Sequence, residues 1–168
     1  MLEVARRLSQ LLGVLALDAA GRFQDSIGSS GTDAGALVHL HAYPGDSIEQ
    51  LRAVLGVSQP GTVKVVDRLA AGGLLERRAG RDGRTRALHL TSAGRETVDR
   101  ILLGRASALE QVLEVLDVDE RARLEPLLEK LVSGLAHDRP GALTVCRMCD
   151  REVCCEAPAG CPLQHTVG

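Results

Sequence analysis

Residues 47–91 constrain the fold more than any other stretch, because they combine two short helical patterns with a tight turn and an arginine-rich hairpin. Ser47 can accept hydrogen bonds from the first amides of a helix, and Gln50 can reach back to complete a capping box. Gly56 permits a sharp turn after this helix, and Ser58 is well suited to cap the next one. The stretch therefore predicts a helix-turn-helix.

The second of these helices has two distinct faces. Val65, Val66 and Leu69 recur at helical spacing and predict a buried side. Polar side chains are expected to point outward from it: Gln59, Thr62, Lys64 and Arg68. Amide, hydroxyl and guanidinium groups match the donor and acceptor patterns of base edges in the major groove. The sequence therefore predicts a helix that reads duplex DNA.

The segments 74–77 and 86–90 have strand character, and Asp82-Gly83 between them is a strong hairpin signal. Arg84 is then at or beside the hairpin tip, where it can enter the minor groove, while Arg77, Arg78 and Arg86 lie near phosphates. Residues 58–86 carry seven basic and three acidic side chains, a net charge of +4, although the whole chain is -2. The alternative is a solvated charged face on a bundle that binds no nucleic acid.

These residues resemble the MarR (multiple antibiotic resistance regulator) family of bacterial transcription factors. The resemblance depends on six short sequence motifs taken together: Ser47-Ile48-Glu49-Gln50-Leu51, Leu55-Gly56-Val57-Ser58-Gln59-Pro60-Gly61, Val66-Asp67-Arg68-Leu69, Gly73-Leu74-Leu75-Glu76-Arg77, Asp82-Gly83-Arg84 and Leu88-His89-Leu90-Thr91-Ser92-Ala93-Gly94. It implies an obligate homodimer in which each winged helix reads half of a palindromic operator. It also implies a repressor that a small-molecule effector releases.

The resemblance further implies which side chains face DNA from the recognition helix: Ser58, Gln59, Gly61, Thr62, Lys64 and Arg68. Arg84 would be the wing arginine, with Asp82 bracing it. Family members often carry arginine where this chain has Lys64, which keeps the cation but lacks the planar fork.

The expected fold class is mainly α with a small β-hairpin wing, that is, a winged helix-turn-helix with dimerisation helices at both ends. Four regions are predicted: an N-terminal dimerisation helix and linker (1–32), the DNA-binding region (33–91), C-terminal dimerisation helices (92–138) and a cysteine-rich metal-binding tail (139–168). Residues 26–35 are polar and glycine-rich, which predicts a flexible connection.

Apolar stripes run along the predicted terminal helices, at 4–15, 98–116 and 124–135. They exceed what one small winged helix can cover, which favours dimerisation over the alternative of a monomeric bundle that buries them internally. Thr91 or Ser92 can cap the long helix, and Asp117 with Glu120 offers a capping box for the last. Pro126 would lie inside that last helix, so the helix either kinks there or begins near it.

Composition narrows the class of partner and the compartment. Phe23 and Tyr43 are the only aromatic residues, which argues against modules that stack on single-stranded or RNA bases. The start of the chain loosely resembles a secretory signal, but Ser9, Gln10 and Asp18 interrupt its apolar run, and its period is that of an amphipathic helix. We therefore expect a cytoplasmic protein with no membrane partner.

All five cysteines lie in the last 23 residues, in a C-x-x-C pair followed by Cys154-Cys155 and Cys161. Four thiolates can complete a closed tetrahedral zinc site, for which we predict Cys146, Cys149, Cys154 and Cys161, with Cys155 as a substitute and His165 as a reserve ligand. Structural zinc competes with two other readings, a redox or labile-metal sensor and an iron-sulfur cluster. A disulfide framework is disfavoured in the cytosol. A subset of MarR-like sequences resembles this tail as well, which implies metal binding.

No nucleophile elbow, phosphate loop or paired catalytic carboxylates occur, so the chain is not expected to be an enzyme. The best enzyme alternative is a zinc-dependent or thiol oxidoreductase that uses the tail. A second alternative is a winged-helix protein-interaction module. His39, His41 and Tyr43 are predicted to border a cleft where an effector could bind, although ordinary helix roles also suit them.

Overall fold

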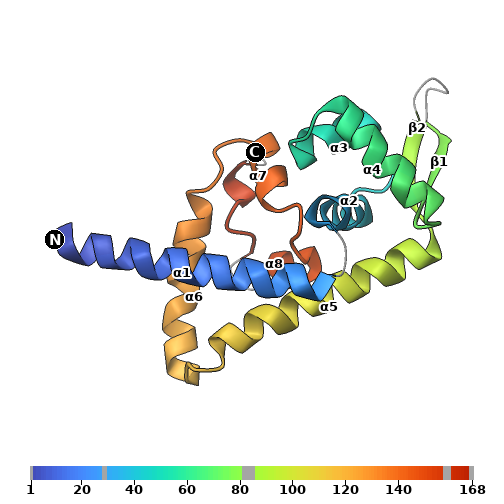
Figure 1. Cartoon of the computed structure of the whole chain (residues 1–168). Helices are drawn as coiled ribbons and strands as arrows, with labels where there is room; N and C mark the ends of the chain where they lie inside the picture. Colours follow the sequence, from blue (N-terminus) through green and yellow to red (C-terminus); the bar gives the residue numbers. More distant parts are fainter. Residues whose placement is uncertain (1, 28–29, 81–85, 157–159, 167–168) are drawn as a thin grey trace.

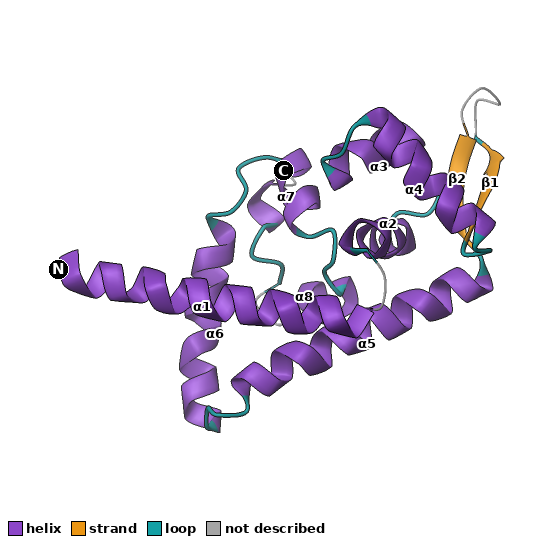
Figure 2. Ribbon diagram, viewed as in Figure 1, coloured by secondary structure: helices purple, strands orange, loops and turns teal. Residues whose placement is uncertain are grey.

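The computed structural model describes residues 2–27, 30–80, 86–156 and 160–166 (Figure 1). Long helices form the lower part of the molecule and the hairpin stands at one end (Figures 1 and 2). The elements in chain order are α1 (Leu2–Ile27), α2 (Gly31–Ala42), α3 (Ile48–Leu55), α4 (Gln59–Ala71), β1 (Leu75–Ala79), β2 (Arg86–Leu90), α5 (Ser92–Leu113), α6 (Val118–Ser133), α7 (Arg139–Val145), α8 (Arg151–Glu156) and a 3-10 turn (Gln164–Thr166). The predicted mainly α fold with a two-stranded hairpin wing is confirmed.

The winged-helix unit, defined here as α2, α3, α4, β1 and β2, contains the main core of the described residues. Leu37 and Leu40 of α2 pack with Leu51 of α3, Val66 of α4 and Leu88 of β2, all at most 2% exposed. Burial of several leucine and valine side chains, each worth about 1.5–3 kcal/mol, holds the three helices and the hairpin together. One leucine- and valine-rich core thus fixes how α4 and the wing sit relative to each other.

The helix boundaries in this unit follow the predicted caps. The Ser47 hydroxyl accepts from the Gln50 amide at 3.3 Å, and the Ser47 amide donates to the Gln50 side chain at 2.9 Å, which completes the capping box. Gly56 adopts a φ of 65° as it ends α3, a region that glycine enters without strain. Ser58 caps α4 by accepting from the Gly61 amide.

The hairpin pairs β1 with β2 in antiparallel register, from Leu75 opposite Leu90 to Ala79 opposite Arg86. Its base is fixed by Thr91, whose amide donates to the Leu74 carbonyl at 3.1 Å and whose hydroxyl donates to the Gly73 carbonyl at 2.7 Å. The same hydroxyl accepts from the Gly94 amide, so Thr91 is also the cap of α5. The predicted cap is therefore confirmed, and it ties the wing to the long helix.

The expected flexible connection at 26–35 needs correction. α1 continues to Ile27, and α2 already begins at Gly31. Ser30 explains the early start, because its side chain accepts from the Asp33 amide at 3.1 Å and caps α2. Most of the predicted flexible connection 26–35 is thus helical, since a cap outweighs the low helix propensity of its glycines.

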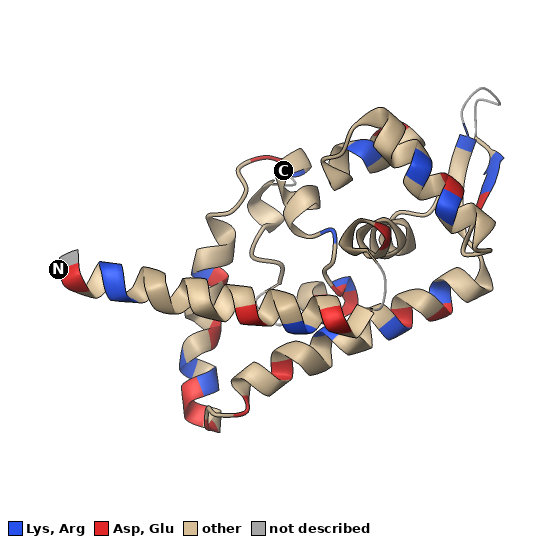
Figure 3. Ribbon diagram, in the orientation of Figure 1, with Lys and Arg blue, Asp and Glu red and all other residues tan. Residues whose placement is uncertain are grey.

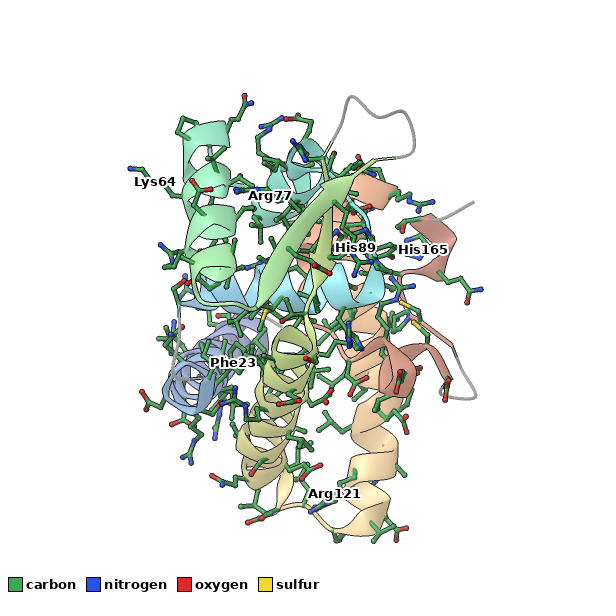
Figure 4. All side chains as sticks on the ribbon, turned by 90° about the vertical axis from the view of Figure 1, so that its right-hand side faces the viewer. Phe23, Lys64, Arg77, His89, Arg121 and His165 are labelled. Atoms are coloured by element: carbon green, nitrogen blue, oxygen red, sulfur yellow. The ribbon has the colours of Figure 1, made fainter. Side chains whose placement is uncertain are left out.

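α1 lies along α5, and Phe23 is situated where the two helices meet (Figures 1 and 4). α6 begins after the Asp117–Glu120 capping box and runs through Pro126 to Ser133, so the helix does not start at the proline. Among the described residues, no helix is both long and apolar enough to span a lipid bilayer.

Candidate nucleic-acid interface and cysteine cluster

α4 presents a polar face to solvent beside the hairpin. Ser58, Gln59 and Lys64 are exposed, Gly61 is half-buried, and Lys64 projects away from the body of the molecule (Figure 4). Basic residues mark α4, β1 and β2 on one side of the winged-helix unit (Figure 3). No ion pair involving Lys64 is formed within the described ranges, which leaves its ammonium available to a phosphate or base.

The predicted outward position of Thr62 is wrong. Its side chain is fully buried, and the hydroxyl donates to the Ser58 carbonyl at 3.2 Å. The reason lies in the helical period, because Thr62 stands three and four residues before Val65 and Val66 and therefore shares their inner face. The hydroxyl makes its hydrogen bond within the helix-turn-helix and is not accessible to DNA.

Arg68 is tied to the start of α2. Its guanidinium donates two hydrogen bonds to Asp33, at 2.8 Å from Nε and 2.5 Å from Nη2, and the pKa of Arg68 is raised by this hydrogen-bonded carboxylate. The Asp33 side chain is only 11% exposed, whereas that of Arg68 is 57% exposed. In this structure Arg68 braces α4 against α2. Sequence reasoning missed Asp33, although its place three residues after the Ser30 cap marks it as a first-turn residue.

The wing arginines are partly engaged within the unit. Arg77 Nη2 donates to Asp67 of α4 at 2.5 Å, and Arg78 Nε donates to Glu76 of the same strand at 2.9 Å. Arg86 is exposed at the start of β2. Arg84 and Asp82, predicted as the wing arginine and its brace, lie outside the described residues. The contact between Arg77 and Asp67 fixes the hairpin against α4.

The cysteine tail, defined as residues 139–166 where described, folds as α7, α8 and the 3-10 turn around a small cluster. Ala142 and Leu163 are buried there together with Ala136. All five cysteines are free thiols; Cys155 is exposed and the other four are half-buried. His165 is exposed and interacts with the Pro162 carbonyl through Nδ1 at 3.1 Å.

Three of the predicted ligands, Cys146, Cys149 and Cys154, shift the pKa of their neighbours in the tail. A hydrogen bond with Cys149 holds the pKa of Cys146 below its ordinary value, and the pKa of Cys149 is raised by the same bond. Burial raises the pKa of Cys154 to about 12. Cys161 is close enough to interact electrostatically with Cys146 and Cys154. In the part of the chain that is described, no group of three or more histidine, cysteine, aspartate or glutamate side chains is arranged to hold a metal ion.

A cleft of about 740 Å³ lies between α2, α5 and the tail, lined by Val38, His41, Leu102 and Arg151 among others. His41 lines this cleft. His39 is instead buried, with Nε2 2.9 Å from the Asp46 carboxylate, and Tyr43 stacks on its ring. Of the three predicted residues, only His41 faces this cleft.

A capped helix-turn-helix followed by a two-stranded hairpin, with a polar face on its second helix, defines a winged helix-turn-helix protein. Residues 27–85 match the MarR family. Transcriptional repressor MprA of Escherichia coli strain K12 is 32% identical over 103 residues, which cover 60% of this chain and 58% of that protein. The alignment thus spans less than two thirds of this relative.

Solved structures share the architecture. A probable transcriptional regulator from Pseudomonas aeruginosa is 27% identical, with a TM-score of 0.58 over 76% of this chain and 98% of that one. A MarR family protein from Bacillus stearothermophilus is 22% identical, with a TM-score of 0.70 over 78% and 94% of the two chains. The winged-helix unit of this chain is thus similar to that of MarR family proteins, and the similarity to the family model is confined to residues 27–85.

Proposed function

We propose that the protein is a sequence-specific regulator of transcription that binds a palindromic operator as a homodimer and acts as a repressor. The observation that carries this proposal is the solvent-facing polar side of α4, with Ser58, Gln59 and Lys64, next to an arginine-bearing hairpin. A helix of this kind enters a major groove, and the wing then contacts the flanking backbone.

Dimerisation is supported by apolar side chains that the single chain leaves in solvent. In α1 the stripe consists of Val4, Leu8, Leu11, Leu12 and Leu15, each at least 50% exposed. In α6 Leu127 and Leu131 are also exposed, as is Leu135 just after the helix ends. Contiguous apolar surface of this extent marks an interface. A second copy that covers both stripes would place two recognition helices on one side of a duplex.

Selection of bound duplexes from a random pool with purified protein tests this function. We expect enrichment of a palindrome whose affinity falls steeply with salt, because phosphate contacts release counterions. Lys64→Ala should weaken binding and flatten the salt dependence. Lys130→Ala removes the only other lysine, an exposed one on α6, and should leave binding unchanged. Binding to a protein partner without any affinity for duplexes would favour the interaction-module alternative.

The cysteine tail is proposed to hold one zinc ion through Cys146, Cys149, Cys154 and Cys161, with Cys155 as the substitute ligand. The donor chemistry supports this, since thiolates suit zinc and all four of these cysteines line one cavity of the tail. A tetrahedral site would require the thiols to rotate toward a common centre. The test is to measure the metal content of protein purified without chelator, and we expect one zinc ion per chain. An iron-sulfur chromophore would show that the site holds such a cluster instead of zinc. Five titratable thiols without metal would show that there is no metal site.

Effector binding is proposed for the cleft of about 740 Å³ that His41 lines between α2 and α5. A ligand there would separate the winged-helix unit from the long helices and so alter the spacing of the two recognition helices. We further propose that the protein acts in the cytoplasm, where its operator would be.

A further inference from the structure

The turn that carries the C-x-x-C pair packs directly on the winged-helix unit. Met148 contacts the core shared by α2, α3 and the hairpin. Opposite it, Gly35 of α2 has no side chain, and a Cβ there would lie 3.5 Å from Met148 Sδ and 3.6 Å from Arg147 Cδ. The two residues between Cys146 and Cys149 are therefore fitted against α2, so their position depends on how the flanking cysteines are held.

A second contact joins the tail to the end of α2. Arg151 is the first residue of α8, between Cys149 and Cys154. Its guanidinium carbon lies 4.9 Å from the centroid of the Tyr43 ring, and its Nη1 donates a hydrogen bond to the Tyr43 hydroxyl. A cation above an aromatic face together with a hydrogen bond gives this contact a defined geometry. Movement of α8 would break it.

Tyr43 in turn is linked to the wing. Its ring stacks on His39 with centroids 4.9 Å apart, and His39 Nε2 lies 2.9 Å from the Asp46 carboxylate. The backbone of residues 45 and 46 then pairs with β2: the Leu88 amide donates to the Asp46 carbonyl at 3.0 Å, and the Gly45 amide donates to the Leu88 carbonyl at 2.9 Å. Direct contacts thus run from the cysteines to the strand that carries the wing.

We propose that occupancy of the cysteine site by a thiolate-seeking divalent cation controls DNA affinity through Arg151 and Tyr43. This inference rests on the proposed DNA-binding function. With the cation bound, α8 is held, Arg151 engages Tyr43, and the 43–46 segment keeps β2 in the position that serves the operator. Loss of the cation frees α8 and lets the wing relax. Because the coupling is reciprocal, operator DNA raises the affinity for the cation by the same factor.

Tyr43 provides an internal reporter, since it is the only tyrosine and the chain has no tryptophan. Adding zinc to the full-length, zinc-free protein should change tyrosine fluorescence with a one-to-one endpoint. Arg151→Ala should bind zinc with the same stoichiometry but lose this change. Arg139→Ala, which removes an exposed arginine from α7, should retain it.

Operator affinity of the zinc-loaded and zinc-free forms completes the test. Ordinary allosteric couplings span roughly 5- to 150-fold, and we expect about a tenfold loss when zinc is removed from the wild type. In Arg151→Ala and in the conservative Tyr43→Phe, which keeps the ring but lacks the hydroxyl, the loss should shrink to about twofold or less. Thermal melts of both variants establish that they fold.

The outcomes separate the two proposals. Absence of duplex binding in every form overturns the proposed function. Three outcomes overturn the coupling while leaving the DNA-binding function intact. They are duplex binding that does not change with zinc, a protein that takes up no zinc, and a full zinc response in both variants.

Discussion

Replacing Gly94 by alanine should destabilise the fold, because α5 approaches the base of the wing at this residue. An alanine Cβ would lie 2.1 Å from the Leu74 carbonyl oxygen and 3.3 Å from Leu90 Cβ. The first neighbour is backbone and cannot rotate away, so the start of α5 must move. That movement strains the hydrogen bonds from Thr91 to the carbonyls of Gly73 and Leu74.

The magnitude follows from opposing contributions. Overpacking costs about 1–3 kcal/mol, and a weakened hydrogen bond costs about 1 kcal/mol more. Alanine recovers at most about 1 kcal/mol of helix propensity, and less near a helix end. We therefore expect a net loss of roughly 1–4 kcal/mol, a substantial part of the 5–15 kcal/mol typical of folded proteins.

Urea unfolding followed by circular dichroism, at one protein concentration because a dimer is expected, measures this loss. The control is Gly13→Ala in α1, where a Cβ would meet nothing within 4 Å and the residue lies opposite the leucine stripe. That variant should be up to about 1 kcal/mol more stable than the wild type. If Gly94→Ala unfolds at the wild-type midpoint, the contact between α5 and residue 74 is not formed as described.

Three further predictions follow from the site. We expect equal losses of operator affinity in Asp33→Asn, in Arg68→Ala and in the double variant, because the two side chains act together to hold α4 against α2. A lower salt dependence of binding in Arg68→Ala alone would instead show that Arg68 contacts a phosphate. Leu11→Asp should convert the dimer to monomer and abolish operator binding, as measured by sedimentation and anisotropy, whereas an intact dimer would remove α1 from the interface. In zinc-free protein, Cys146 should be the first thiol alkylated as pH rises, because its lowered pKa yields the thiolate at a lower pH than that of Cys149 or Cys154. Peptide mass spectrometry that finds Cys154 alkylated before Cys146 would contradict this.

Local chemistry made the winged-helix unit predictable. Ser47 with Gln50, Gly56 and Ser58 satisfy backbone groups within a few residues, so their roles follow from spacing alone. Thr91 and the Asp117–Glu120 box are predictable for the same reason. The inward position of Thr62 was also available from its spacing to Val65 and Val66.

Contacts between distant segments were not predictable from one chain. The pairing of Asp33 with Arg68 joins residues 35 positions apart, and that of Tyr43 with Arg151 joins residues 108 positions apart. Neither pair has a local signature, because the two partners are brought together only by the tertiary fold. The docking of Met148 on Gly35 likewise depends on tertiary packing, which overrides the flexible character that glycine-rich composition suggests.

Hydroxyl-radical footprinting of the zinc-loaded protein on its selected palindrome tests the central claim most directly. Two symmetric protected patches are expected, with centres about 10 base pairs apart on one side of the duplex and one dimer bound per site. Lys64→Ala should weaken both patches equally. A single asymmetric patch, or uniform protection that is the same on an unrelated duplex, would contradict a paired reader of adjacent major grooves.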